Sequence, residues 1–344
     1  ATLKTIGKVP KCGSIETKLA IEAANKAFPK WKAKTAKERS LILRKWHDLI
    51  MQNQEDLAKI MTLEQGKPFN ESKGEIAYGA SFIELYAEEG KRVYGETIPD
   101  PLPDRRIIVI KQPVGVVAAI TPWNFPSSMI TRKAGPALAV GCSVVLRPPT
   151  QTPLSALALA YLADNAGMPP GVFNVVMGTD SSGMGKELCS NDLVRKITFT
   201  GSTEVGRILM RQCSDQIKKV SLELGGNAPF IVFDDADIDA AVSGAMISKY
   251  RNAGQTCVCA NRIYVQDSIY DEFSKKLADA SNALKVGNGF DEGITTGPLI
   301  DTQGLEKVEE HIEDAISKGA SVLSVAHEHH HRRAGELPAR SGAP

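Results

Sequence analysis

The segment Val114-Gly-Val-Val-Ala-Ala-Ile120 leads directly into Thr121-Pro-Trp-Asn124-Phe-Pro126. A short apolar run bounded by proline is typical of a strand in the interior of a sheet. Apolar runs of similar length recur, alternating with helical segments such as 154–166 and 203–214. The other strands predicted in this way span residues 107–110, 143–146, 174–177 and 196–200. This alternation predicts an α/β fold with a mostly parallel sheet and helices on both faces.

The chain on either side of this alternation differs in character. The first hundred residues have helical apolar periodicity, and Thr35-Ala-Lys-Glu38 and Ser72-Lys-Gly-Glu75 carry the capping-box signature of a helix start. After Glu223 a second α/β series begins. Its predicted strands are 229–233 and 262–265, and its predicted helices lie near 238–250, 269–284 and 306–318. We therefore expect one unit in residues 1–225 and a second in residues 226–325.

Residues 326–344 lack periodicity and hold four of the six histidines. We expect a disordered or non-native tail there, without a defined metal site. The rest of the chain has an ordinary globular composition, with 42% hydrophobic and 24% charged residues. The net charge of +1 gives no reason to expect nucleic acid or an anionic membrane as a partner, and no apolar run is long enough to span a bilayer.

Three motifs carry groups suited to carbonyl chemistry. In Arg251-Asn-Ala-Gly-Gln-Thr-Cys257-Val-Cys259 the first cysteine follows a small, flexible Ala-Gly step. Leu222-Glu223-Leu-Gly-Gly226 supplies a carboxylate 34 residues earlier, and Asn124 an amide 133 residues earlier. A thiol nucleophile, a base and an amide donor suit acyl transfer. Each motif alone also fits a plain structural role, a buried thiol or a strand end.

Together, in this order and at these spacings, the motifs resemble the aldehyde dehydrogenase superfamily. The resemblance implies a Rossmann-type parallel-sheet domain in residues 1–225 and an incomplete α/β catalytic domain in residues 226–325. It implies that the Cys257 thiolate attacks an aldehyde to give a thiohemiacetal, which loses hydride to become a thioester. Asn124 and the Cys257 backbone N–H would stabilise the oxyanion, and Glu223 would activate the hydrolytic water.

The turn Phe199-Thr-Gly201-Ser202-Thr-Glu-Val-Gly206 lies between a predicted strand and a predicted helix. Such a turn lets dinucleotide phosphates approach the N–H groups of a helix N-terminus, although an unliganded βα turn has a similar sequence. It resembles the Gly-Ser-Thr-x-x-Gly turn of the family, which implies cofactor contacts for Gly201, Ser202 and Gly206. The resemblance implies further contacts for Trp123 and Gly225.

The strand end Val145-Leu-Arg147-Pro-Pro-Thr150 resembles the segment that holds the adenosine ribose in the family. Arg147 replaces the usual lysine, and Thr150 replaces an acid that would repel a 2′-phosphate. We therefore expect NAD or NADP as the cofactor.

Arg132 and Arg251 lie near the motif residues in sequence, and a surface salt bridge is the usual fate of such arginines. Both sequence neighbourhoods resemble the succinate-semialdehyde dehydrogenase branch, in its eukaryotic, plant-like form, where both arginines hold the distal carboxylate of the substrate. The resemblance implies NAD(P)-dependent oxidation of succinate semialdehyde to succinate. Other aldehydes, or a non-catalytic dinucleotide-binding protein, stay as alternatives.

The resemblance runs from about residue 15 to residue 323, whereas family members continue further, so we expect a chain truncated at the C-terminus. The expected location is the mitochondrial matrix, with the cytoplasm as the alternative. Family members form homo-oligomers, but the segment that joins subunits would be missing here. Cys259, one residue beyond Cys257, is a candidate for a redox disulfide with it, although the ring would be strained.

Overall fold

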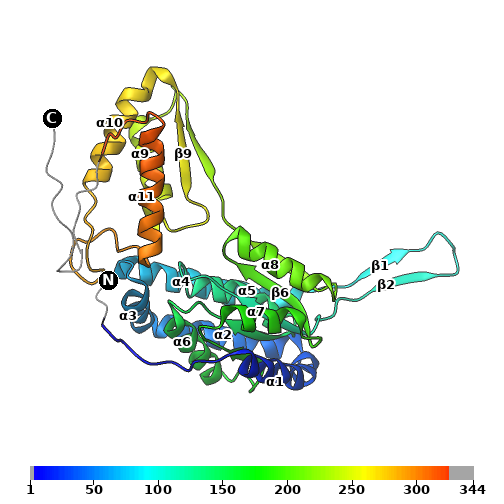
Figure 1. The fold of residues 1–344 in the computed structure, drawn as a ribbon. Helices are drawn as coiled ribbons and strands as arrows, with labels where there is room; N and C mark the ends of the chain where they lie inside the picture. Colours follow the sequence, from blue (N-terminus) through cyan, green and yellow to red (C-terminus); the bar gives the residue numbers. More distant parts are fainter. Residues whose placement is uncertain (1–3, 325–344) are drawn as a thin grey trace.

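The computed structural model describes residues 4–324. Figure 1 shows a helix-covered parallel sheet, a hairpin that projects from it, and a second α/β unit that stands on the opposite side. The described helices do not include one that is long and apolar enough to cross a membrane.

Four helices precede the sheet: α1 (Ser14–Ala33), α2 (Ala36–Gln52), α3 (Gln54–Gln65) and α4 (Phe69–Glu89). The capping box predicted at Thr35 is confirmed, since its hydroxyl accepts from the Glu38 N–H and the Glu38 carboxylate accepts from the Thr35 N–H. The prediction at Ser72 was wrong, because α4 begins three residues earlier, after Pro68. Ser72 lies inside the helix, where its hydroxyl bonds Thr62 at 2.8 Å.

The main sheet has five parallel strands in the order β5-β4-β3-β6-β7, which confirms the predicted fold class. Its strands are β3 (Val116–Ile120), β4 (Ser143–Arg147), β5 (Phe173–Val175), β6 (Val194–Thr200) and β7 (Lys219–Glu223). The helices between them are α5 (Ser128–Ala139), α6 (Pro153–Asn165), α7 (Ser181–Ser190) and α8 (Thr203–Ser214). Because the strands are parallel, the segments that follow β3, β4, β6 and β7 meet at one edge of the sheet.

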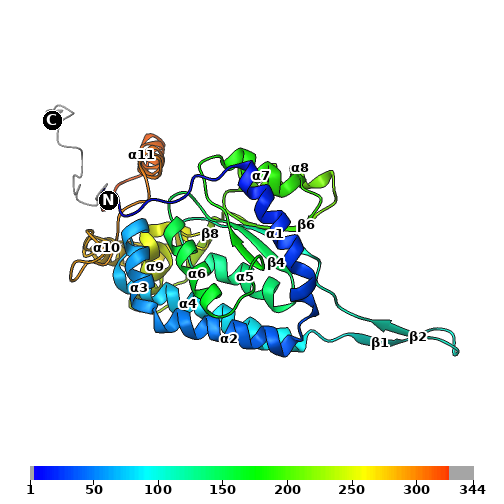
Figure 2. The same cartoon turned by 90° about the horizontal axis from the view of Figure 1, so that it is seen from below.

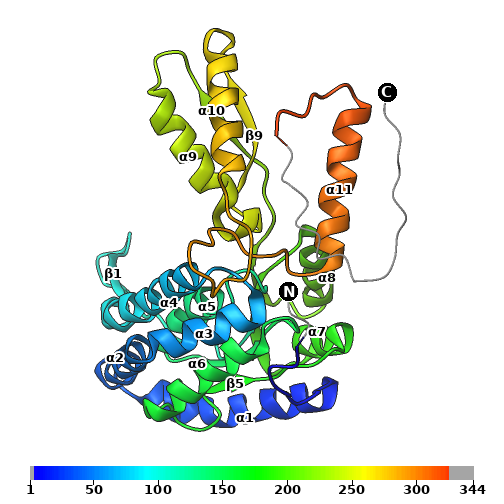
Figure 3. The same ribbon diagram turned by 90° about the vertical axis from the view of Figure 1, so that its left-hand side faces the viewer.

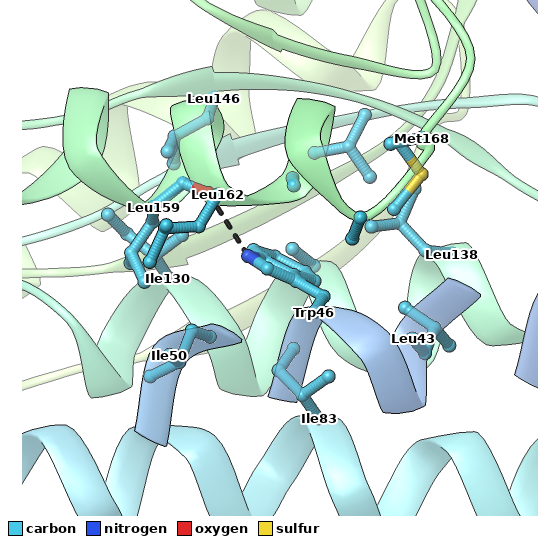
Figure 4. Close-up of a cluster of buried hydrophobic side chains, with 14 of the residues drawn as sticks. Leu43, Trp46, Ile50, Ile83, Ile130, Leu138, Leu146, Leu159, Leu162 and Met168 are labelled. Carbon is cyan, nitrogen blue, oxygen red and sulfur yellow. Dashed lines mark hydrogen bonds between the residues drawn. The ribbon is translucent and has the colours of Figure 1, made fainter. Parts of the chain in front are cut away.

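Helices cover both faces of this sheet (Figure 2). Val117 and Ala119 of β3 pack into a cluster with α2 to α6, whereas Val116, Ala118 and Ile120 pack into a second cluster with α1, α7 and α8. Figure 4 shows Trp46 at the centre of the first cluster, where its indole N–H donates to the Leu159 carbonyl at 3.1 Å. The continuous apolar run of β3 is therefore explained by burial on both faces.

The predicted strand at 107–110 does not belong to the parallel sheet. β2 (Arg106–Val109) pairs antiparallel with β1 (Glu96–Pro99), which the helical prediction for the first hundred residues had missed. A short 3-10 helix, η1 (Gly90–Arg92), leads into this hairpin. Its apolar side chains stay exposed, Ile108 at 73%, so the apolar pattern alone cannot distinguish it from a buried strand.

The second unit has a small parallel sheet of β8 (Ala228–Val232) and β9 (Ala260–Val265). Its helices are α9 (Ile238–Tyr250), α10 (Tyr270–Asn282) and α11 (Thr302–Ser317), with short 3-10 turns η2 (Arg251–Gly254) and η3 (Asp267–Ile269). The elements predicted after Glu223 are thus present. A small core around Val232, Val242 and Phe273 joins α9 and α10 to the sheet, whereas α11 stands apart from them (Figure 3).

Candidate active site

Cys257 lies between η2 and β9, and its side chain is exposed. The turn before it has left-handed backbone at Asn252 (φ 52°), Ala253 (φ 55°) and Gly254 (φ 75°). A non-glycine residue in this region costs about 1 kcal/mol or more, so surrounding contacts must hold the turn. The flexible step expected from the sequence is a fixed left-handed turn.

Asn252, which is buried, provides those contacts. Its backbone N–H donates to the Glu71 carboxylate at 3.1 Å, and its side-chain oxygen accepts from Gln65 Nε2 at 2.9 Å. Its Nδ2 donates to the carbonyl of Asn124 at 3.0 Å. The cysteine loop is therefore tied to α3, to α4 and to the Asn124 segment.

The side chain of Asn124 makes a second link. Its Nδ2 donates to the Gln255 carbonyl at 2.9 Å, two residues before Cys257. Its Oδ1 is buried and accepts no hydrogen bond within the described part of the chain. The structure thus brings together two sequence motifs that are 133 residues apart.

A buried ion pair holds the backbone of Asn124 in place. Lys67 Nζ lies 2.5 Å from Glu75 Oε2 and donates to the Asn124 carbonyl at 2.9 Å. The other oxygen of Glu75 accepts from the N–H groups of Ser127 and Ser128 at 2.9 and 3.2 Å, at the N-terminus of α5. The capping signature at Ser72 predicted that Glu75 caps its own helix, but this carboxylate stabilises the start of α5 instead.

Glu223 is the last residue of β7 and is exposed. Its carbonyl accepts from the Gly201 N–H at 3.1 Å. A Cβ at Gly226, in the same motif, would lie only 2.9 Å from the Cys257 carbonyl oxygen, so the third motif also reaches the cysteine loop. The Glu223 carboxylate attracts the buried Lys133 ammonium, whose pKa burial nevertheless lowers to about 8.

The expected cofactor residues follow the parallel strands. Trp123 comes after β3, Arg147 ends β4, Gly201 follows β6 and Gly225 follows β7. In the sheet register Ile120 pairs with both Arg147 and Phe199, so these strand ends are level with one another. They therefore share the carboxyl edge of the sheet, where open α/β sheets bind their ligands.

The turn at this edge is built for close approach. The Ser202 hydroxyl caps α8 by accepting from the Val205 N–H at 3.3 Å. A Cβ at Gly206 would lie 2.7 Å from the end of the Leu224 side chain, so a larger residue there would force that side chain to move.

Arg147 and Thr150 have different surroundings. Arg147 is half-buried, burial lowers its pKa, and its guanidinium donates to the Ser181 hydroxyl of α7. Its Nε is buried without a hydrogen-bond partner among residues 4–324. Thr150 is exposed and lines a cavity of about 430 Å³ with Glu64, Phe290 and Pro298.

Both candidate substrate arginines are exposed and lie over aromatic rings. The Arg251 guanidinium carbon lies 5.2 Å from the ring centre of Phe125, the neighbour of Asn124. The Arg132 guanidinium carbon lies 5.2 Å from the ring centre of Phe82 in α4. Neither arginine forms a salt bridge with the described residues, so the surface ion pair considered from the sequence is not what holds them.

Cys259 is buried, and its thiol donates to the Lys249 carbonyl at 3.4 Å. Both Cys257 and Cys259 are free thiols in the structure. A redox link between them stays a prediction. Residues 4–324 contain no group of three or more histidine, cysteine, aspartate or glutamate side chains that could hold a metal ion, and the histidine cluster of the tail lies outside the described residues.

The sequence profile of the aldehyde dehydrogenase family matches residues 1–337. The chain belongs to the aldehyde dehydrogenase family. The matched range is longer than the resemblance drawn from the sequence, about residues 15–323, and it includes residues 326–337 of the tail that was expected to be disordered or non-native. The resemblance drawn from Cys257, Glu223 and Asn124 is thereby confirmed at the level of the family.

Named relatives specify the branch. The chain is 68% identical to the glutarate-semialdehyde dehydrogenase of Pseudomonas putida KT2440, covering 94% of this chain and 67% of the relative. It is 66% identical to GabD, the NADP(+) succinate-semialdehyde dehydrogenase of Escherichia coli K12, over 92% of this chain and 66% of the relative. The mitochondrial succinate-semialdehyde dehydrogenase of Arabidopsis thaliana is 58% identical, with 94% and 61% covered. The chain thus spans about two thirds of the length of these relatives.

A solved structure agrees with the fold. The crystal structure of an E. coli NADP-dependent enzyme superposes with a TM-score of 0.93 at 65% identity, covering 94% of this chain and 67% of that one. The aldehyde dehydrogenase-like fold class predicted from the sequence is confirmed.

Proposed function

We propose that this aldehyde dehydrogenase oxidises a short aldehyde with a distal carboxylate, succinate semialdehyde, to the diacid with NAD or NADP. The observation that carries the proposal is the convergence of three motifs on the Cys257 loop. Asn124 donates to the Gln255 carbonyl, and Gly226 approaches the Cys257 carbonyl. Relatives named for succinate and glutarate semialdehydes support the substrate class.

In this proposal the exposed Cys257 thiol, as thiolate, adds to the aldehyde carbon. The Cys257 backbone N–H and an Asn124 side-chain N–H stabilise the oxyanion that forms, and the hydrogen bonds of Asn252 and Lys67 keep these donors in place. Glu223 then takes a proton from the water that hydrolyses the thioester on Cys257. The ordered, partly buried support for Asn124 is what makes its amide a pre-positioned donor.

The residues at the carboxyl edge of the sheet fit a dinucleotide. The N-terminus of α8, with Ser202 and Gly206, offers N–H groups and a positive dipole end to phosphates. The orphaned buried Nε of Arg147 is a donor in need of an acceptor, such as a ribose or phosphate oxygen. Trp123, Thr150, Gly201 and Gly225 complete the set that we assign to this cofactor. When bound, NAD or NADP supplies the hydride acceptor.

We assign Arg132 and Arg251 to the distal carboxylate. Both guanidinium groups lie over aromatic rings. Apart from a weak contact of Arg132 Nη1 with the Met129 sulfur at 4.0 Å, their N–H groups have no hydrogen-bond acceptor among the described residues and can receive a carboxylate. A lost hydrogen bond to a charged group costs about 1.5–3 kcal/mol, equivalent to about tenfold or more in kcat/KM. Succinate and glutarate semialdehydes differ by one methylene, which such a pocket separates only weakly.

The test compares kcat/KM for succinate semialdehyde, glutarate semialdehyde and butanal in Arg132→Leu and Arg251→Leu. It uses this chain and a chimera that continues it with the remaining segment of the E. coli relative. The control is Arg262→Leu, since Arg262 also lies over an aromatic ring, Tyr264, at 5.9 Å. Loss confined to the two semialdehydes supports the proposal. Equal losses on butanal would assign the arginines to the fold, and cofactor binding without turnover in the chimera would favour a non-catalytic protein.

For the location, the higher identity of the bacterial relatives favours the cytoplasmic alternative over the mitochondrial matrix.

We also propose a homo-oligomer, because the projecting β1–β2 hairpin exposes apolar side chains that a second copy would cover. Sedimentation of the purified chain tests the homo-oligomer, and a monomer at all concentrations would contradict it.

A further inference from the structure

Two buried thiols lie together in the body of the protein, in the last turns of α7 and α8. Cys189 is 0% exposed and Cys213 is 1% exposed, and both belong to the same apolar cluster. They lie near the amino ends of the parallel strands, whereas the candidate active site is at the carboxyl ends. Neither thiol has a part in the aldehyde chemistry.

The packing register of α7 against α8 brings these cysteines face to face. A Cβ at Gly185 of α7 would lie 3.8 Å from the Leu209 side chain of α8. On a helix, residues four apart lie on one face, one turn from each other. Advancing both helices by one turn from Gly185 and Leu209 leads to Cys189 and Cys213.

The segment after α8 fastens the ends of the two helices to each other. The Lys218 N–H donates to the Cys213 carbonyl at 3.3 Å, and its ammonium donates to the carbonyls of Asn191 and Val194, both at 2.7 Å. The Gln216 side chain donates to the Ser190 carbonyl. Lys218 therefore reaches from the end of one cysteine-bearing helix to the end of the other.

The two neighbouring thiols influence each other's pKa in opposite directions. The Cys189 thiol lowers the pKa of Cys213, and the Cys213 thiol, together with burial, raises the pKa of Cys189. The nearby Lys218 ammonium further favours a thiolate at Cys213. Cys213 is thus the sulfur better able to act as a nucleophile, with Cys189 as its proton-bearing partner.

We propose that Cys189 and Cys213 form a reversible dithiol–disulfide site whose oxidant is a small hydroperoxide. With hydrogen peroxide, the Cys213 thiolate attacks one oxygen, the O–O bond breaks, and the leaving hydroxide takes up the proton that Cys213 released, forming water. The Cys189 sulfur then attacks the resulting sulfenic acid, the S–O bond breaks, and a second water leaves with the Cys189 proton. The sulfur pair loses two electrons, and hydrogen peroxide becomes two waters.

We assign the oxidant's route to the buried pair to the segment of Gln216, Ile217 and Lys218. Ile217, between Gln216 and Lys218, is 91% exposed and has left-handed backbone (φ 51°), a strained state for a β-branched residue. Gln216, Ile217 and Lys218 line an open surface hollow of about 520 Å³ together with Asp192. In this proposal the oxidant reaches the buried thiols when this short strained segment opens.

The test treats the parent chain with hydrogen peroxide, alkylates the remaining thiols after denaturation, and maps the peptides by mass spectrometry. We expect a linked Cys189–Cys213 peptide, lighter by two hydrogen atoms than the sum of its parts, that dithiothreitol separates. Cys142→Ser, which changes a buried cysteine of the other core cluster, should keep the link. Cys213→Ser should lose it, leaving Cys189 alkylated.

Peptide mapping of the peroxide-treated parent chain is decisive by itself, so the result does not depend on whether a cysteine variant folds. If Cys189 and Cys213 are recovered alkylated to the same extent as Cys142 after peroxide, the proposal is overturned. A disulfide of either cysteine to a third residue would overturn it equally.

Discussion

Replacing Lys67 by methionine should destabilise the protein more than any exposed lysine substitution. The Lys67 and Glu75 side chains are 1% and 3% exposed, so the change leaves a carboxylate buried without its cation. Removing one partner of a buried pair costs about 3–5 kcal/mol. Glu75 keeps two backbone N–H donors, so we expect about 3 kcal/mol. The variant also removes the ammonium from the Asn124 carbonyl, so turnover should fall as well.

Urea unfolding followed by tryptophan fluorescence measures this effect, because Trp31 and Trp46 are buried in the cluster beside the pair. The control is Lys73→Met, which breaks an exposed pair with Glu55 and should cost less than about 1 kcal/mol. The double variant Lys67→Met/Glu75→Gln should recover most of the loss, since no buried charge remains. A Lys67→Met cost as small as that of the control would refute the reasoning.

Two further predictions concern the Glu64 carboxylate and the close approach of Gly226 to the Cys257 loop. Glu64 accepts from the N–H groups of Leu154 and Ser155, and burial raises its pKa from 4.5 to about 7. Between these pH values the folded state holds more protons than the unfolded state, so stability falls as pH rises, by up to about 3 kcal/mol. Urea unfolding at pH 4.5 and 7.5 measures this loss of stability, which Glu64→Gln should abolish. An equal loss of stability in the parent and the variant would contradict the prediction. Gly226→Ala should move the Cys257 loop, because the added Cβ meets the Cys257 carbonyl at 2.9 Å. Turnover should fall while the melting temperature changes little; unchanged turnover would count against that contact.

The sequence predicted the parallel sheet well, because buried strands such as β3 are apolar throughout and their flanking helices have clear periodicity. It failed where apolar residues are not buried. Residues 107–110 have the composition of an interior strand, yet they lie in the exposed β1–β2 hairpin. The signature at Ser72–Glu75 misled for a related reason, since Glu75 forms its contacts with Lys67 and α5, which local sequence does not reveal.

The candidate site was likewise predicted only in part from the sequence. Motif spacing selected Cys257 and Asn124, and the structure brings their segments together through hydrogen bonds. The residues that hold them there were missed: Lys67 reaches Asn124 across 57 positions, and Gln65 reaches Asn252 across 187. Such long-range pairs have no local signature. A left-handed Asn252 next to Ala253 is equally invisible, because its backbone is imposed by these tertiary contacts.

The most direct test of a single site built around Cys257 is to trap its acyl intermediate. Glu223→Gln, in the chimera with the remaining segment of the E. coli relative, is mixed with succinate semialdehyde and NADP, quenched in acid and mapped by mass spectrometry. We predict one burst of NADPH and a succinyl thioester on the Cys257 peptide, absent after Cys257→Ala. An acyl group on Cys259 or elsewhere, or steady turnover that survives Cys257→Ala, would contradict the account.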